Sequence, residues 1–242
     1  MSKTPWLYMP TLENEKEMPL PDSELRHLVY VHRRRVGDQF VLFDGKGRIV
    51  TAEINEIVRK PLRMQYRELS REQISPGKKY LHLATALPKG DRQTLLLDFA
   101  TQLGVTNFVP LQCERSVSHV RANSYERWMK ILIESCKQSH RPWLPNLQEP
   151  VAPLEYLHEC KARDGLVLLA DPDGVSPNDL KPNTLSSVNI SLFVGPEGGF
   201  TAAEYNGLVS SGVLPVSLGR STLRVETAAV AFAAIIRNLF DL

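Results

Sequence analysis

The sequence contains few cysteines, no long apolar run and little net charge. Its three cysteines, Cys113, Cys136 and Cys160, lie far apart and form no C-x-x-C pair, which favours neither a disulfide framework nor a zinc site. The longest apolar run, at residues 228–236, is too short to cross a bilayer. The first residues lack the apolar core of a signal peptide. We therefore expect a cytoplasmic protein with reduced thiols and no membrane partner.

Common nucleotide and metal motifs are absent too. The chain has no G-x-x-x-x-G-K-[ST] string for nucleotide phosphates and no H-E-x-x-H pair for zinc. Its six histidines have no metal-ligand spacing, so no metal is expected. These absences disfavour a nucleotide-dependent enzyme.

The first part of the chain has the pattern of a β module. Between residues 39 and 57, apolar and polar residues roughly alternate on both sides of Asp44-Gly45, a dipeptide typical of tight hairpin turns. Pro21-Asp22-Ser23 offers an N-cap for one short helix before the hairpin. The polar segment 70–79 contains a Pro-Gly pair and is expected to be a linker.

In the rest of the chain, strands alternate with helices. The expected strands are near-continuously apolar, which is typical of a parallel sheet covered on both faces. We therefore predict an α/β fold with two domains, a β module at residues 1–73 and an α/β domain at residues 74–242. Ligands of such sheets bind at the carboxyl ends of strands, which here are followed by the loops after Ala170, Val194 and Leu218.

Three glycines, Gly195, Gly198 and Gly199, mark one of these strand ends. A helix is expected directly after them, because Thr201 and Glu204 have the spacing of a capping box. Glycines allow a sharp bend and a close approach of a ligand to backbone amides. The glutamate in this string and the absence of lysine favour a neutral or cationic ligand over a polyphosphate. A tight turn without any ligand is the alternative.

A second strand end, in residues 218–239, has the same order of strand, glycine, polar loop and helix. The helix is apolar almost all round, so it could lie between its own sheet and a partner subunit. Glu226 suits the positive end of this helix, whereas Arg224 does not. Arg224 is therefore retained either for a ligand or for a salt bridge within the protein.

These two strings, LFVGPEGGFTAAE and LGRSTLRVETAA, resemble the C-terminal signature of the bacterial small-subunit rRNA uridine-N3 methyltransferases, which belong to the SPOUT class. FDGKG at 43–47, QLGV at 102–105, ERSV at 114–117 and CKQSHR at 136–141 agree with the same family. The resemblance implies a PUA-like β-barrel followed by a SPOUT α/β domain with a deep trefoil knot. It also implies a homodimer through the C-terminal domain. Knots are rare, so this one is expected from the resemblance alone.

The resemblance further implies S-adenosyl-L-methionine as the cofactor, held between the loops of the knot. This cofactor carries a sulfonium and no phosphates, which suits a glycine corner without lysine. The expected cofactor-binding residues are Leu169, Val194, Gly195, Pro196, Glu197, Gly198, Gly199, Leu218, Gly219, Arg220, Leu223 and Arg224. Glu197 is expected either to shape its loop or to favour the sulfonium.

The implied reaction is methyl transfer to N3 of a uridine in ribosomal RNA, within the small ribosomal subunit. The base must be unpaired, because N3 carries a proton and is normally paired. Loss of that proton makes N3 nucleophilic, and a cation near O2 or O4 would stabilise the anion. Arg224 is the first candidate for that cation and Arg141 the next. Glu226 is a candidate proton acceptor, or a residue that orients the loop.

Basic residues are concentrated in the β module. Residues 26–71 carry eleven Lys or Arg against five acids, which is a pattern typical of phosphate binding. The residues expected to bind RNA are Arg33, Arg34, Arg35, Gln138 and Arg141. For the three consecutive arginines, the alternative is a solvated helix end.

The chain departs from the family pattern at three positions. Lys3 is the only basic residue among the first few, where an arginine is usual, and Phe99 and Gln102 replace the usual Lys and Glu. Two other functions therefore stay open. One is a SPOUT methyltransferase that acts on another RNA position, for example in tRNA. The other is a non-catalytic RNA-binding or ribosome-assembly factor.

Overall fold

The computed structural model describes residues 4–12, 20–118, 120, 123–180 and 189–241; Lys3 lies outside them. The chain forms two compact units, one of Met1–Pro76 with Ile133–Leu144 and one of Gly77–Leu132 with Pro145–Leu242. The sequence pattern does not indicate that residues 133–144 belong with the first unit. The domain boundary between residues 73 and 74 stays a prediction.

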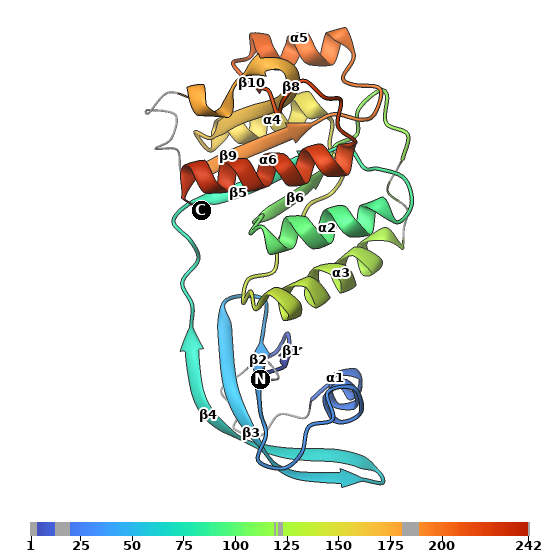
Figure 1. Cartoon of the computed structure of the whole chain (residues 1–242), viewed down its shortest axis with the longest axis vertical. Helices are drawn as coiled ribbons and strands as arrows, with labels where there is room; N and C mark the ends of the chain where they lie inside the picture. Colours follow the sequence, from blue (N-terminus) through green and yellow to red (C-terminus); the bar gives the residue numbers. More distant parts are fainter. Residues whose placement is uncertain (1–3, 13–19, 119, 121–122, 181–188, 242) are drawn as a thin grey trace. The chain divides into compact units, whose positions relative to one another are not determined.

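The first unit contains a four-stranded sheet in the order β1-β2-β3-β4 (Figure 1). β1 (Trp6–Tyr8) pairs in parallel with β2 (Gln39–Phe43), and β2 pairs antiparallel with β3 (Arg48–Arg59). β3 continues antiparallel to β4 (Leu62–Gln73). The expected hairpin around residues 44–47 is therefore present. Within the described part of the chain β1 and β4 are sheet edges, so the β module is seen as an open sheet there.

A short helical segment packs on this sheet. It consists of α1 (Asp22–Arg26) and a π-helical turn, η1 (His27–Val31). The N-cap is Pro21 and no side chain caps the helix, so the expected capping by a neighbouring polar side chain is not found. Its apolar residues join a core with Phe40 and Leu42 of β2. β4 ends only at Gln73, and the start of the expected linker is therefore a strand.

The second unit contains a six-stranded sheet in the order β10-β8-β9-β5-β6-β7, and all of its pairings are parallel. The strands are β5 (Tyr80–Thr85), β6 (Asn107–Pro110), β7 (Asn146–Leu147), β8 (Leu166–Val175), β9 (Asn189–Val194) and β10 (Leu214–Val216). The helices are α2 (Arg92–Gln102), α3 (Ser124–Ser139), α4 (Pro153–Ala162), η2 (Pro177–Asp179), α5 (Ala202–Ser210) and α6 (Val225–Phe240). α3 ends within the residues of the first unit.

Helices cover both faces of the parallel sheet, as predicted. On one face α6 contacts α2, β5 and β9, and Figure 1 shows α6 lying across these strands. On the other face α4 contacts α5 and β8. Alternate residues of a strand face opposite ways. Leu169 and Phe193 therefore join the α4–α5 core, whereas their neighbours Leu168 and Leu192 are buried on the other face.

β8 does not run straight beside β10. Pro215 pairs with Leu169, but the next residue, Val216, pairs with Val175. The chain between these two pairing points therefore leaves the ladder and returns. A Cβ on Gly174 would lie 2.5 Å from the backbone of Pro215, so only glycine fits this close approach. The threading of the chain through a knot stays a prediction.

Candidate active site

A cavity lies at the carboxyl ends of β8, β9 and β10, where ligands of parallel sheets bind. Its volume is about 340 Å³. The loops after these three strands are the ones predicted from the sequence to hold a ligand. Nine of the twelve residues predicted to bind the cofactor line this cavity, namely Leu169, Val194, Gly195, Pro196, Glu197, Gly199, Leu218, Gly219 and Leu223.

Some predicted residues do not line the cavity, and some lining residues were not predicted. Gly198, Arg220 and Arg224 are absent from the lining. The lining residues that sequence reasoning missed are Ala170, Asp171, Pro172, Phe200, Tyr205, Ser221, Thr222, Val225 and Ala228. Most of them neighbour the predicted residues along the chain. Tyr205 lies one turn into α5, and it could have been found only by asking which face of α5 points toward the strand ends.

The glycine corner combines a tight turn with close packing. The Gly199 amide donates to the Pro196 carbonyl at 2.8 Å, and Gly199 has a φ of +69°, which glycine adopts without strain. Gly195 is needed for a different reason. A Cβ there would lie 2.9 Å from the ring of Phe200. Gly198 has no such constraint, since its Cβ would meet only the Arg115 side chain at 3.5 Å.

The helix after the corner begins with the predicted capping box. Thr201 Oγ1 accepts from the Glu204 amide at 3.3 Å, and Glu204 Oε2 accepts from the Thr201 amide at 2.8 Å. The other carboxylate oxygen, Oε1, accepts from the Glu114 amide at 2.9 Å. Arg115 donates to the Gly198 carbonyl at 2.9 Å. The ERSV string therefore holds the corner in place.

Asp171 and Tyr205 form a polar pair in the cavity wall. The Tyr205 hydroxyl donates to Asp171 Oδ2, and the Asp173 amide donates to Asp171 Oδ1 at 2.9 Å. The hydrogen bond to Asp171, together with burial, raises the pKa of Tyr205 to about 12. Tyr205 therefore stays a protonated donor at physiological pH, and Asp171 keeps a fixed carboxylate beside the cavity.

Arg92, which was not predicted from the sequence, connects the two predicted loops. Its guanidinium lies 3.5 Å from Glu197 Oε1 and 3.6 Å from Glu226 Oε2. Glu226 Oε2 is buried and has no hydrogen-bond partner among the described atoms, so Arg92 provides an ion pair only. Arg92 begins α2, after the carboxyl end of β5. Arg92 would have been predicted if the loop after β5 had also been considered, because that loop follows the carboxyl end of a parallel strand as well.

The two predicted catalytic residues lie at the start of α6. Arg224 is its N-cap, makes no side-chain capping bond and is exposed. Glu226 lies in the first turn with 13% of its side chain exposed. The structure therefore places both beside the cavity-lining residues Leu223 and Val225.

The thiols are poor nucleophiles. Cys113, Cys136 and Cys160 are all buried, and burial is the main cause that raises the pKa of each. Among the described residues, no group of three or more His, Cys, Asp or Glu side chains is arranged to hold a metal ion. In the same part of the chain, no helix has the length and apolarity needed to cross a membrane.

All five residues predicted to bind RNA belong to the first unit. Arg33 and Arg35 are exposed, and Arg34 is half-buried. Gln138 is exposed near the end of α3, and Arg141 follows it half-buried. Three apolar side chains near the arginine cluster, Tyr30, Val31 and Val36, are also exposed.

Comparison with known proteins decides the family. The RNA methyltransferase domain family matches residues 75–237, and the RNA methyltransferase PUA domain family matches residues 20–63. The chain belongs to the RNA methyltransferase family. The resemblance seen in the sequence is thereby confirmed, as is a PUA-like β module followed by an α/β domain.

Relatives within this family match almost the whole chain. "Ribosomal RNA small subunit methyltransferase E" of Synechocystis sp. is 33% identical over 94% of this chain and 75% of its own length. The protein of the same name from Rickettsia conorii is 33% identical over 94% of this chain and 91% of its own length. The crystal structure of a Neisseria gonorrhoeae protein of that name, bound to S-adenosyl methionine, is 30% identical, with a TM-score of 0.86 over 98% of both chains.

Proposed function

We propose that this protein transfers a methyl group from S-adenosyl-L-methionine to N3 of a uridine in small-subunit ribosomal RNA. The proposal rests on family membership, on the names of the relatives and on the chemistry of the cavity.

The charge of the cavity wall is the observation that carries the proposal. Among the described residues, its lining includes two carboxylates, those of Asp171 and Glu197, and neither lysine nor arginine. Because Arg92 pairs with Glu197, it is the Asp171 carboxylate that would repel phosphates and attract a cation at this wall. A methyl sulfonium with an amino-acid tail and a neutral adenine fits this wall, and a nucleotide polyphosphate does not. Apolar residues such as Leu218 and Val194 offer the surface for an uncharged base.

Two residues at the start of α6 are our candidates to remove the N3 proton of the base and to stabilise the resulting anion. Removal of the N3 proton leaves a uridine anion, and the exposed guanidinium of Arg224 is our candidate to stabilise it at O2 or O4. The buried Oε2 of Glu226 has no hydrogen-bond partner among the described atoms. It is therefore our candidate proton acceptor, either directly or through water. When bound, the cofactor would supply the methyl group, and its sulfur would leave as a neutral thioether.

Three further features belong to the proposal. Arg33, Arg34, Arg35, Gln138 and Arg141 bind the RNA, within the small ribosomal subunit. The α/β domain contains the SPOUT knot and forms a homodimer. Leu95 and Phe99 support the dimer, because both are exposed on α2 one turn apart. The protein acts in the cytoplasm, where ribosomes are assembled.

Mass-spectrometric mapping of ribosomal RNA from cells with and without the protein tests the reaction. We expect one N3-methyluridine in small-subunit RNA to disappear when the protein is absent and to return with the wild-type gene. A methyl group lost from tRNA instead would identify the alternative substrate. Absence of S-adenosyl-L-methionine binding by calorimetry would favour an assembly factor and contradict the proposal.

The Arg224→Ala variant tests the role of the arginine separately. It should fold and bind S-adenosyl-L-methionine, but its kcat for RNA methylation should fall by about a hundredfold or more, since one lost anion-stabilising contact has about this effect. Lys161→Ala, which removes an exposed cation on α4, is the control. An undiminished rate in Arg224→Ala would eliminate the proposed role.

A further inference from the structure

Two aromatic rings stack in the first unit without a role in the site described above. The rings of Trp6 and His140 are 5.3 Å apart between centroids, with an interplanar angle of 6°. His140 is exposed, so part of its ring stays accessible despite the stack. Its φ of +56° is uncommon for a residue other than glycine. The backbone at this position would therefore accept glycine readily, and the ring is not needed for the turn.

Both rings are attached to the same hairpin. Trp6 pairs with Val41 of β2, and its ring lies 5.5 Å from that of the buried Phe43. His140 precedes a segment that pairs with the hairpin loop. There the Gly47 amide donates to the Pro142 carbonyl, and the Leu144 amide donates to the Gly45 carbonyl, both at 3.0 Å. The stack is thus held from two sides, although Trp6 and His140 are far apart in the sequence.

Glycine makes the close approach of this segment to the loop possible. A Cβ on Gly45 would lie 2.5 Å from the Leu144 side chain, and a Cβ on Gly47 would lie 2.5 Å from the ring of Trp143. The two strings FDGKG and CKQSHR, both noted in the sequence, therefore meet at one place in the fold.

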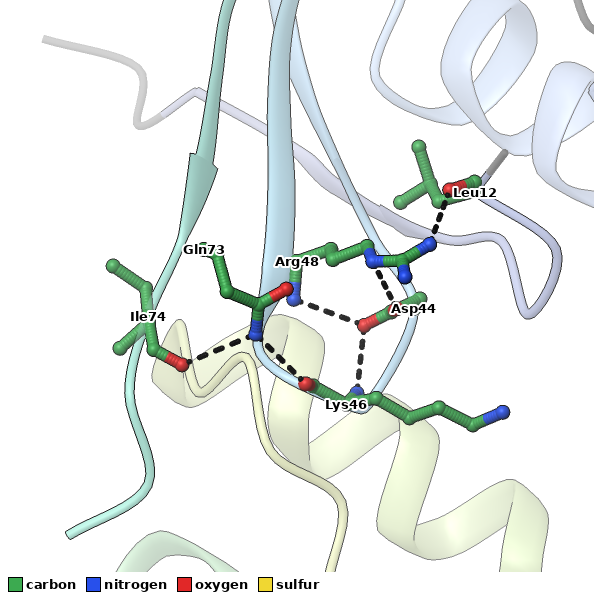
Figure 2. Close-up of polar contacts among 6 residues, drawn as sticks. All are labelled: Leu12, Asp44, Lys46, Arg48, Gln73 and Ile74. Carbon is green, nitrogen blue, oxygen red and sulfur yellow. Dashed lines mark hydrogen bonds and ion pairs between the residues drawn. The ribbon is translucent and has the colours of Figure 1, made fainter. Parts of the chain in front are cut away.

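Side-chain hydrogen bonds from Asp44 and Gln73 hold the hairpin loop (Figure 2). Asp44 is only 4% exposed, and its Oδ1 accepts from the amides of Lys46 at 2.7 Å and Arg48 at 3.1 Å. The Gln73 side chain donates to the Lys46 carbonyl at 3.2 Å. Figure 2 shows the Lys46 side chain pointing away from these contacts. The buried carboxylate holds the loop, while Lys46 and Arg48 are exposed.

We propose that the stacked Trp6–His140 pair, with Lys46, is a binding site for one unpaired base of an RNA and its adjoining phosphate. Aromatic rings stack on any nucleobase, and a neighbouring lysine binds the backbone. Because the rings and the loop are already fixed, binding costs little ordering. The exposed amide of Gln138, two residues before His140, adds hydrogen-bonding capacity. The inference rests on the proposed action on RNA and assigns part of the RNA contact to Trp6, His140 and Lys46.

The test compares two ligands of equal length, an oligouridylate and an abasic phosphoribose strand, by fluorescence anisotropy with the full-length protein. Wild type should bind the oligouridylate about tenfold more tightly, because stacking of one base has about this effect. His140→Gly should remove this preference, and His140→Phe should keep it. Lys46→Ala should weaken binding of both ligands and reduce the salt slope by about one.

Controls separate this inference from loss of fold and from failure of the proposed function. His140→Gly should keep its melting temperature within a few degrees, since glycine suits the backbone there. His158→Ala changes an exposed histidine of α4 and should bind both ligands as wild type does. Calorimetry with S-adenosyl-L-methionine should be unaffected in all these variants.

Two results would overturn the inference. One is a folded His140→Gly protein that still prefers the oligouridylate tenfold. The other is a wild type that binds both strands equally. Either result leaves the proposed methyl transfer intact if the protein binds the cofactor and methylates ribosomal RNA. Loss of cofactor binding by wild type would instead contradict the proposed function.

Discussion

Arg92 shows how one side chain connects loops that are far apart in sequence. It pairs with Glu197 of the glycine corner and with Glu226 of α6. About a third of the Arg92 and Glu197 side chains is exposed, so this pair adds less than about 1 kcal/mol to stability. Arg92 matters for its position. It brings a cation to two carboxylates, whereas the described lining of the cavity contains no lysine or arginine.

Glu226 provides a direct test of proton removal. Glu226→Gln should lower kcat by about a hundredfold or more, because a positioned base contributes about this factor. The Kd for S-adenosyl-L-methionine should change less than threefold, since Glu226 does not line the cavity. Glu155→Gln, an exposed glutamate of α4, is the control. If Glu226→Gln turns over at the wild-type rate, another group accepts the proton.

His82 should make the stability of the second unit depend on pH. Burial, and then the charge of Arg163, lowers the pKa of His82 from 6.5 to about 4. The unfolded chain therefore binds this proton at a higher pH than the folded chain does. As the pH falls from 6.5 to 4, the free energy of unfolding should drop by up to about 3 kcal/mol.

Urea unfolding of wild type and His82→Gln at several pH values measures this effect. In the native state Asn107 lies 2.6 Å from the ring nitrogen Nδ1 of His82, so the variant should be less stable at pH 7. Its stability should nevertheless change less between pH 6.5 and 4. His158→Gln, which changes an exposed histidine of α4, is the matched control. Equal slopes in wild type and His82→Gln would refute the prediction.

The structure of the glycine corner depends both on its local sequence and on its packing. Its capping box depends on neighbouring residues, whereas its closeness to Phe200 depends on how the loop folds back on itself. The need for glycine at position 195 therefore arises from packing, and the need at position 199 arises from backbone conformation.

Gly195→Ala should lower the free energy of unfolding by about 1–3 kcal/mol, the usual cost of an overpacked site. Phe200→Leu in the same chain should recover much of that loss, since the ring is the atom group that the new Cβ meets at 2.9 Å. Thermal melts of both single variants and the double variant provide the measurement. Additive losses would show that Phe200 is not the cause.

Variants of α2 test whether the protein forms the proposed homodimer. Leu95 and Phe99 are 48% and 42% exposed, and we expect a second copy to cover them in solution. Changing both to Glu should convert the dimer to a monomer in size-exclusion chromatography with light scattering, because each charge would be buried unpaired. Leu154→Glu alters a similarly exposed leucine, 38%, on α4 and should stay dimeric. A wild-type monomer would refute the dimer itself.

Local patterns determined much of this protein. Apolar alternation predicted the hairpin, and continuous apolar strands predicted the parallel sheet. The capping box of Thr201 and Glu204 was predicted from spacing alone. The strand-end rule pointed to three loops that line the cavity. These features could be predicted because each depends on residues close together in the chain.

Long-range packing decided the rest. Arg92 reaches Glu226 across 134 positions, and Tyr205 reaches Asp171 across 34. Pro142 and Leu144 form hydrogen bonds with Gly47 and Gly45, which lie 95 and 99 positions earlier. The same segment brings His140 onto Trp6. No periodicity or spacing in the sequence indicates such contacts, because they form only when separate elements have folded and packed together.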